Sequence, residues 1–253
     1  MSSAREDTSG QPTVRSVERA LEVLELLERA DRPMRLVELG RGTGLSSATL
    51  LRLLAVLQRR DLVASSGGEY RLGVATLGMA HGYISTDPLS NRARPHLQQL
   101  ADTTKLTTSL YVRSADERIL AVRVDGTHPL RYQLPLGRRL ALHLGAGKPI
   151  LANLPSDEIA RILEAVGETR RADGRTVSVE GLDADLAAVR RNGFHVSVAE
   201  RDTAVASISV PVFSSTGEVI ASLSASGPVE STDPDRLHEW APELRRAAAA
   251  VGR

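Results

Sequence analysis

The chain has 253 residues, of which 42% are hydrophobic and 25% charged, and its formal net charge is +1. This length suits two modest domains, and the composition excludes extensive disorder. The sequence has no cysteine, which excludes disulfides, thiolate metal sites and cysteine nucleophiles and fits a reducing cytoplasm. No run of about 18 apolar residues could span a bilayer. We therefore expect a cytoplasmic protein without a membrane partner.

The first twelve residues, MSSAREDTSGQP, are small, polar and mixed in charge. They lack the apolar core of a signal peptide and predict a flexible tail over 1–12. Basic charge is concentrated further along the chain, because the stretch 39–60 holds four arginines and no acid. A protein that binds DNA needs only such a local basic surface, since phosphate charge acts over roughly one Debye length.

The stretch from residue 16 to residue 72 predicts three helices followed by a hairpin. Ser16 is expected to cap the first helix, in which apolar residues repeat at helical spacing: Val17, Ala20, Leu21, Leu24 and Leu27. A short second helix over 36–41 leads through a glycine-containing turn to a third helix capped by Ser46. The buried stripe of that third helix is predicted to be Leu50, Leu53, Leu54 and Leu57. Two strand-like pieces, 62–64 and 70–72, then flank a glycine-rich turn.

This order of elements is typical of a winged helix-turn-helix, in which the third helix enters the major groove and the wing rests on the DNA backbone. Hydroxyl groups can bond phosphates or base edges, and arginine can pair with guanine or a phosphate. The residues predicted to contact double-stranded DNA are Arg15, Ser46, Ser47, Thr49, Arg52, Arg59, Gly68 and Arg71. A protein-interaction module is an alternative for the same three helices, with Ser46 acting only as a cap.

The segment from about residue 89 onward mixes strand-like and helical stretches and predicts an α+β domain with an antiparallel sheet flanked by helices. Strands are expected near 107–112, 118–124, 131–134, 194–198, 207–213 and 218–226. Alternation along the last strand places Ser222, Ser224 and Ser226 on one face. Gly145 precedes a predicted helix, where backbone amides favour a carboxylate. These serines could instead simply face water.

Several segments, taken in order, resemble the IclR family of bacterial transcriptional regulators. They are SVERALEVLELLERADRPMRLVELGRGTGLSSATLLRLLAVLQRRDLV, YRLG, ARPHLQQLADTT, LHLGAGKPILA, RRNGFHVSVAE and IASLSASGP. The resemblance implies a winged helix-turn-helix domain over 13–73, a linker helix over 74–88 and a GAF-like effector-binding domain over 89–253. It also implies operator binding as a homodimer or a dimer of dimers, under control of a small carboxylic or aromatic acid. The family includes both repressors and activators.

The resemblance further implies which residues meet the effector, namely Leu142, Gly145, Ala146, Ser197, Ser207, Ser224 and Ser226. The chain departs from the family's usual pattern at several of the positions that matter. Ser46-Ser47-Ala48 replace a proline, a lysine and a serine at the start of the recognition helix. Relatives often carry an acid near Ser197 and a cysteine near Ser207. An unusual operator and an unusual effector are therefore expected.

An enzyme is the main alternative, such as a small-molecule hydrolase with an accessory helical domain. The chain lacks the nucleophile elbow G-x-S-x-G, the phosphate loop G-x-x-x-x-G-K-[ST] and the zinc motif H-E-x-x-H. Its six histidines are dispersed without an i,i+4 pair, so the sequence indicates no metal site. We therefore expect a protein that is not an enzyme and that needs no cofactor.

Overall fold

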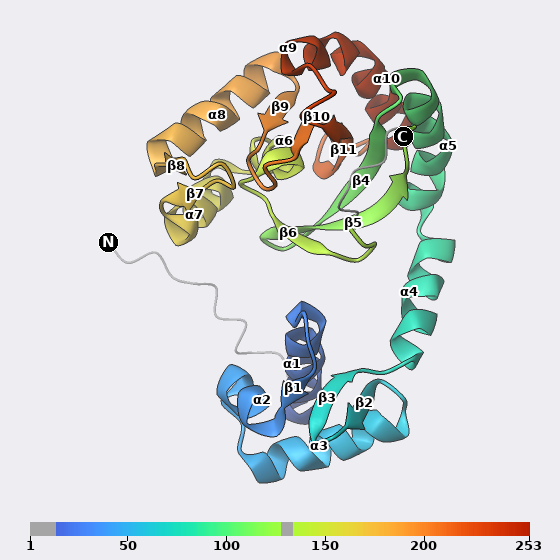
Figure 1. Ribbon diagram of the computed structural model, residues 1–253, viewed down its shortest axis with the longest axis vertical. Helices are drawn as coiled ribbons and strands as arrows, with labels where there is room; N and C mark the ends of the chain where they lie inside the picture. Colours follow the sequence, from blue (N-terminus) through green and yellow to red (C-terminus); the bar gives the residue numbers. More distant parts are fainter. Residues whose placement is uncertain (1–13, 128–133) are drawn as a thin grey trace. The chain divides into compact units, whose positions relative to one another are not determined.

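The computed structural model describes residues 14–127 and 134–253 (Figure 1). The described residues fall into two compact units that divide between Tyr83 and Ile84. The expected tail 1–12 and nearly all of the expected strand 131–134 lie outside the described residues. None of the helices in the described ranges is long and apolar enough to cross a membrane.

The described part of the first unit holds three helices, a small sheet and most of a fourth helix, α4, which continues into the second unit. Its elements are α1 (Arg15–Arg29), β1 (Met34–Arg35), α2 (Leu36–Thr43), α3 (Ser47–Arg59), β2 (Val63–Ser66), β3 (Glu69–Leu72) and α4 (Ala75–Thr86). The sheet order is β1-β3-β2, so the expected hairpin gains a third strand. Met34 pairs with Tyr70, and Arg35 pairs with Glu69. A strand of two residues carries no alternation, which is why the sequence pattern did not reveal it.

Helix α3 follows the prediction closely, whereas α1 departs from it. The Ser46 side chain caps α3 by accepting a hydrogen bond from the Thr49 amide, and three of the four predicted leucines are buried. Helix α1 begins at Arg15 with Val14 as its cap, so the prediction that Ser16 caps it was wrong. Its buried side follows Val23 and Leu27. Val17 and Leu21 are about half exposed, although the apolar repeat predicted that they would be buried.

The second unit is built on an antiparallel sheet with helices on both faces (Figure 1). Its first part contains α5 (Pro88–Thr104), β4 (Thr107–Ser114), β5 (Glu117–Val124), β6 (Arg139–Ala141), η1 (Gly145–Gly147), α6 (Lys148–Leu151) and α7 (Ser156–Val166). The remainder contains β7 (Thr169–Arg170), β8 (Thr176–Val177), α8 (Val179–Asn192), β9 (His195–Val198), β10 (Val205–Phe213), β11 (Val219–Pro228), α9 (Pro234–Leu237), η2 (His238–Trp240) and α10 (Ala241–Val251). Among the described residues, the main sheet has the order β6-β5-β4-β11-β10-β9. At the C-terminus, where a single helix was expected, the 3₁₀ turn η2 separates α9 from α10.

The register of the sheet sorts polar and apolar side chains onto opposite faces. Ser224 on β11 lies opposite Ser109 on β4 and Ser209 on β10. The next residue, Leu223, lies opposite Leu110 and Val210, and all three are fully buried in the core that α5 and α10 cover. Because side chains alternate along a strand, one face is apolar and the other carries a block of hydroxyl groups. A separate apolar cluster joins α6, α7 and α8.

Two glycines of α2 meet very different surroundings, which gives a matched pair of substitutions. A Cβ on Gly42 would lie 2.4 Å from a Leu26 methyl carbon, whereas one on Gly40 would come no closer than 3.4 Å to any atom. Alanine gains about 1 kcal/mol of helix propensity over glycine, but overpacking costs about 1–3 kcal/mol. We expect Gly40→Ala to be neutral or stabilising and Gly42→Ala to be less stable than Gly40→Ala, because the Leu26 side chain must move, as measured by urea unfolding followed by circular dichroism. Equal midpoints for the two variants would contradict this packing.

Candidate functional site

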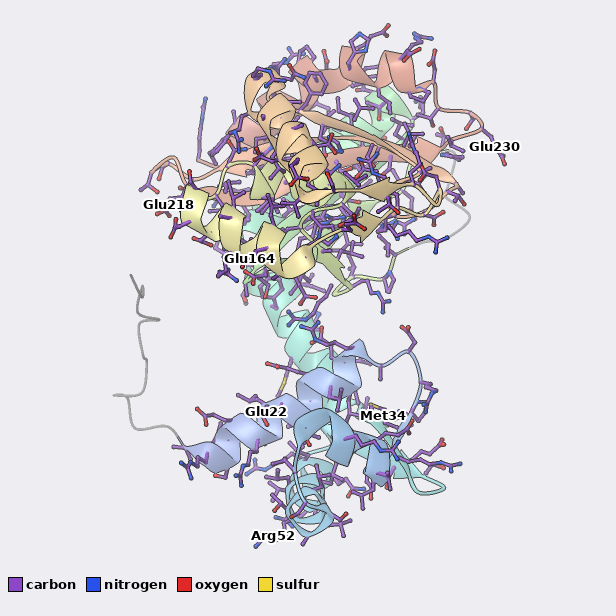
Figure 2. All side chains as sticks on the ribbon, turned by 90° about the vertical axis from the view of Figure 1, so that its left-hand side faces the viewer. Glu22, Met34, Arg52, Glu164, Glu218 and Glu230 are labelled. Atoms are coloured by element: carbon purple, nitrogen blue, oxygen red, sulfur yellow. The ribbon has the colours of Figure 1, made fainter. Side chains whose placement is uncertain are left out.

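The outer side of α3 forms a basic surface. Its exposed residues include Ala48, Arg52, Ala55 and Arg59, and Figure 2 shows Arg52 pointing away from the body of the domain. The helix itself carries no acid. The nearest preceding acid, Glu38, forms an ion pair with Arg32 and accepts a hydrogen bond from the Arg35 amide. The Arg32 hydrogen bond, aided by the Arg35 amide, lowers the pKa of Glu38 to about 2, so Glu38 stays ionised and engaged.

The hairpin of β2 and β3 is tied to the end of α3. Gln58 on α3 donates a hydrogen bond of 2.8 Å to the Ser65 hydroxyl on β2. Gly67 and Gly68 turn the hairpin with φ angles of +61° and +79°, a conformation that favours glycine. Of the residues predicted to contact DNA, those exposed are Arg15, Ser46, Ser47, Arg52, Arg59, Gly68 and Arg71, while Thr49 is half-buried. The Ser46 hydroxyl is occupied as a helix cap.

The hydroxyl face of the main sheet encloses a cavity in the second unit. Its described lining is Thr107, Ser109, Tyr111, Arg118, Leu120, Arg123, Leu134, Gly145, Ala146, Ser197, Glu200, Arg201, Asp202, Val205, Ser207, Ser224 and Ser226. Six of the seven predicted effector residues therefore lie together at this cavity. The exception is Leu142, which packs with Ile150 and Leu186 in the other apolar cluster and is absent from the described lining. We leave Leu142 out of the candidate site.

Four hydroxyl groups around the cavity are available to a ligand. Among the described residues, no hydrogen-bond partner within the protein is found for the side chains of Ser109, Ser197, Ser207 and Ser224. Neighbouring serines are engaged instead. The Ser222 hydroxyl donates a hydrogen bond of 2.6 Å to the Ala146 carbonyl, and the Ser226 hydroxyl donates one of 3.4 Å to the Thr107 carbonyl. Ser207, Ser224 and Ser226 line the cavity, as a ligand-binding role requires. That they contact a ligand stays a prediction.

Arg118 on β5 also lines the cavity, although sequence analysis did not select it. Arg118 is only 2% exposed, and its guanidinium lies 5.0 Å from the centre of the Tyr111 ring. One amino group, Nη1, donates to the carbonyl oxygens of Ala141 and Leu144. No carboxylate of the described residues lies within 4.0 Å of this guanidinium. Burial lowers the pKa of Arg118 to about 10, so it remains positively charged at neutral pH.

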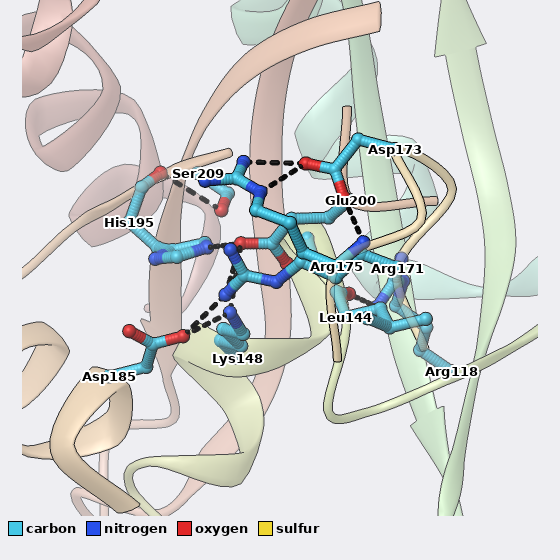
Figure 3. A network of polar contacts seen from close by, with 11 residues as sticks. Arg118, Leu144, Lys148, Arg171, Asp173, Arg175, Asp185, His195, Glu200 and Ser209 are labelled. Carbon is cyan, nitrogen blue, oxygen red and sulfur yellow. Dashed lines mark hydrogen bonds and ion pairs between the residues drawn. The ribbon is translucent and has the colours of Figure 1, made fainter. Parts of the chain in front are cut away.

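A second buried cation, Lys148, is fully paired (Figure 3). Its ammonium lies 2.6 Å from an Asp185 oxygen and 2.8 Å from a Glu200 oxygen. Arg171 contacts both of these carboxylates, at 2.9 Å and 3.5 Å respectively, and His195 Nε2 lies 3.1 Å from Glu200 Oε1. The network joins α6 and α8 to the turn between β7 and β8, to the start of β9 and to the residues that follow β9. Such pairing is what a buried charge requires.

Glu200 connects this network to the cavity. Its second oxygen, Oε2, accepts a hydrogen bond of 2.9 Å from the Gly145 amide in the cavity wall. Burial by itself raises the pKa of Glu200, but contacts with His195 and Lys148 outweigh that effect and hold it well below its usual value. Burial and the charges of Arg118 and Lys148 lower the pKa of the nearby His143. Among the described residues, no group of three or more His, Cys, Asp or Glu side chains could hold a metal ion.

The sequence matches known families over almost all of the described chain. Residues 16–67 match the IclR helix-turn-helix domain, and residues 81–253 match the C-terminal domain of the bacterial transcriptional regulator IclR. The chain belongs to the IclR family. It is therefore a transcriptional regulator with an N-terminal helix-turn-helix domain and a C-terminal effector domain.

Individual members of the IclR family resemble the chain over nearly their whole length. The HTH-type transcriptional regulator XynR of Escherichia coli is 29% identical over 96% of this chain and 97% of its own. An IclR regulator from Alicyclobacillus acidocaldarius superposes with a TM-score of 0.82 at 25% identity, covering 95% and 98% of the two chains. An IclR homologue from Microbacterium hydrocarbonoxydans, solved with 4-hydroxybenzoate, shares the fold with a TM-score of 0.73 at 24% identity and coverages of 94% and 97%.

The buried network predicts that Glu200 stabilises the effector domain of this IclR-family chain. Glu200→Gln removes one of the two carboxylates from a fully buried ammonium, which should cost about 3 kcal/mol of unfolding free energy. Trp240, the single tryptophan, lies in this domain, so urea unfolding followed by tryptophan fluorescence measures the loss. Glu164→Gln on the exposed surface of α7 is the control and should change stability by less than about 0.5 kcal/mol.

The stabilisation by Glu200 should also depend on pH. Because the folded-state pKa lies below the usual value of 4.5, the contribution is complete above pH 4.5 and declines as pH falls below it. The stability difference between the wild-type protein and Glu200→Gln should therefore narrow from pH 6 to pH 3.5. A difference that is the same at both pH values would contradict the charged pairing.

Proposed function

We propose that this chain binds operator DNA as a homodimer, through α3 and the β2–β3 wing, and that a small organic acid in the effector cavity controls that binding. The observation that carries the DNA-binding half is the exposed, acid-free surface of α3, with Arg52 and Arg59 on one side. A recognition helix of this kind reads base edges with its N-terminal half, while the wing contacts phosphates. Two domains of a dimer would then meet two half-sites.

Homodimerisation is supported by apolar side chains that are exposed to solvent in the described part of the chain. Val74 and Leu77 are 71% and 70% exposed, and Met79 is 64% exposed. Helix α4 has no buried residue among those described. Val17 and Leu21 on α1 add further exposed apolar area. Exposed apolar side chains on a helix with no buried residue are typical of an interaction site, and a second copy of this chain is the occupant we propose.

Effector control is supported by the cavity on the hydroxyl face of the sheet and by the family's architecture. The IclR homologue solved with 4-hydroxybenzoate indicates that a carboxylic acid is a suitable class of effector to test. A ligand alters DNA binding only to the extent that its affinity differs between the DNA-binding and non-binding states. The sensing residues proposed here are Gly145, Ala146, Ser197, Ser207, Ser224 and Ser226.

The DNA-binding surface is tested by Arg52→Ala. If this side chain reads a base, its loss should cost about 1–3 kcal/mol of binding free energy. The measurement is fluorescence anisotropy at fixed salt, with the intergenic DNA beside the gene as probe. Arg191→Ala on the exposed surface of α8 is the matched control and should bind normally. Unchanged affinity of Arg52→Ala would remove this residue from the reading surface.

The dimer surface is tested by Leu77→Glu. A charge placed in an apolar interface is desolvated without a partner, so we expect the variant to sediment as a monomer and to bind the DNA probe weakly. Leu136→Glu, at another exposed leucine, should keep the wild-type sedimentation coefficient. If wild type and Leu77→Glu sediment alike in analytical ultracentrifugation, α4 is not the dimer surface.

A further inference from the structure

Among the described residues of the effector domain, the buried cations Arg118 and Lys148 differ in their partners. Lys148 has two carboxylate partners, whereas Arg118 has none among the described residues. Arg118 donates to backbone carbonyls through Nη1 only, and its Nε is buried without a hydrogen-bond partner. The Glu200 charge acts on Arg118 only from beyond 4.0 Å. A buried cation without a carboxylate in direct contact is costly, because its desolvation is only partly offset. An anionic ligand would supply the missing charge.

We propose that Arg118 is the anion-binding residue of the effector cavity and that the effector is a compact hydroxycarboxylate. The inference rests on the proposed function, because it assumes that the cavity is the effector site. It goes further because it assigns the carboxylate of the ligand to Arg118. It assigns the hydroxyl groups of the ligand to the four serines without a partner in the described part of the protein, Ser109, Ser197, Ser207 and Ser224.

The position of the carboxylate follows from the surroundings of Gly145. A Cβ added at Gly145 would lie 3.6 Å from the Ser197 hydroxyl and 3.8 Å from Nη2 of Arg118. The space at Gly145 is therefore bordered by a hydroxyl group and by the free amino group of the guanidinium. The Gly145 amide itself already donates to Glu200. The anion is thus expected to bind the guanidinium, and the sequence-based expectation of a carboxylate on the Gly145 amide is not kept.

The rest of the lining favours a hydroxylated ligand over an aromatic one. Ser109, Ser197, Ser207 and Ser224 each offer a donor and an acceptor that no described residue satisfies. An apolar group buried against them would leave these hydroxyl groups unpaired, which is costly, whereas ligand hydroxyl groups would pair with them. The aromatic ring that faces the cavity, Tyr111, is already covered by Arg118.

The cavity is also small. The volume that the centre of a water molecule can reach is about 50 Å³. One water needs about 10–15 Å³ on this measure, so the cavity has room for a few water molecules. Of the arginines and acids in its described lining, Arg123 is paired with Asp125 and Glu200 with Lys148, whereas Arg118 forms no ion pair with a described residue. A compact monoanion with hydroxyl groups fits this combination of volume, charge and hydrogen-bonding groups.

Isothermal titration calorimetry of the full-length protein tests the ligand class. The probes are D-glycerate and L-lactate as hydroxy acids, glyceramide and lactamide as their neutral counterparts, and benzoate and 4-hydroxybenzoate as aromatic acids. We expect at least one hydroxy acid to bind, with its amide at least about tenfold weaker because the charge is lost. Tighter binding of an aromatic acid, equal binding of acid and amide, or binding by none of the hydroxy acids overturns the proposal.

Substitutions test the residues. Arg118→Lys keeps the charge but loses the planar fork, and Arg118→Met removes the charge, so we expect weakening by at least about tenfold and loss of binding respectively. Because Arg118 also holds two carbonyls, both variants need normal circular dichroism. Ser207→Ala provides an independent test, with Ser209→Ala as its matched control two residues along the same strand. Ser209 is fully buried, bonds the His195 carbonyl and is not part of the described cavity lining.

We expect Ser207→Ala to weaken binding of the best hydroxy acid about five- to tenfold and Ser209→Ala to leave it unchanged. Wild-type affinity in folded Arg118→Met, or equal affinities in the two serine variants, overturns the assignment. DNA binding by the ligand-free protein separates this outcome from failure of the proposed function. A chain that binds the DNA probe but no hydroxy acid remains a regulator with another effector, whereas one that binds no DNA refutes the proposed function itself.

Discussion

Lys148 carries its charge in the interior of the effector domain with no exposed surface, and this imposes a strict requirement on the surrounding chain. An ammonium taken out of water must be surrounded by counter-charges, which here come from Asp185 on α8 and from Glu200 after β9. These partners are far apart in sequence. Their meeting fixes α6 and α8 against the end of β9, and Glu200 in turn holds the Gly145 amide. One wall of the cavity is therefore positioned by an ion-pair network rather than by apolar packing alone.

Arg118 gains its significance from the contrast with that network. The same domain satisfies one buried cation completely and gives the other only backbone carbonyls and an aromatic face. Carbonyl dipoles and the Tyr111 ring offset part of the desolvation cost, and they orient the guanidinium. Neither contributes a full negative charge. A site built in this way holds a positive potential in a place of low dielectric, where it acts strongly on an anion of suitable size.

Much of the fold could be predicted because its signals are local. The cap at Ser46, the leucine spacing of α3 and the serine alternation on β11 each depend on residues a few positions apart, and these predictions are confirmed apart from the burial of Leu53. The failures occur where tertiary contacts decide. Val17 and Leu21 follow the helical apolar repeat, yet α1 turns a neighbouring side toward the core. Strand β1 exists only because β3 is available to pair with it.

The candidate site was also predicted only in part. Resemblance and alternation located the serines and Gly145, because those positions lie in recognisable segments of the chain. Arg118 could not be distinguished from the other arginines, since the feature that sets it apart is the lack of a carboxylate within reach. That feature depends on tertiary contacts, since the Glu200 carboxylate beside the cavity contacts Lys148, Arg171 and His195 and forms no ion pair with Arg118. The ion-pair network therefore positions one wall of the cavity through the Gly145 amide, and it leaves Arg118 as a buried cation of the described lining with no carboxylate of the described residues within 4.0 Å.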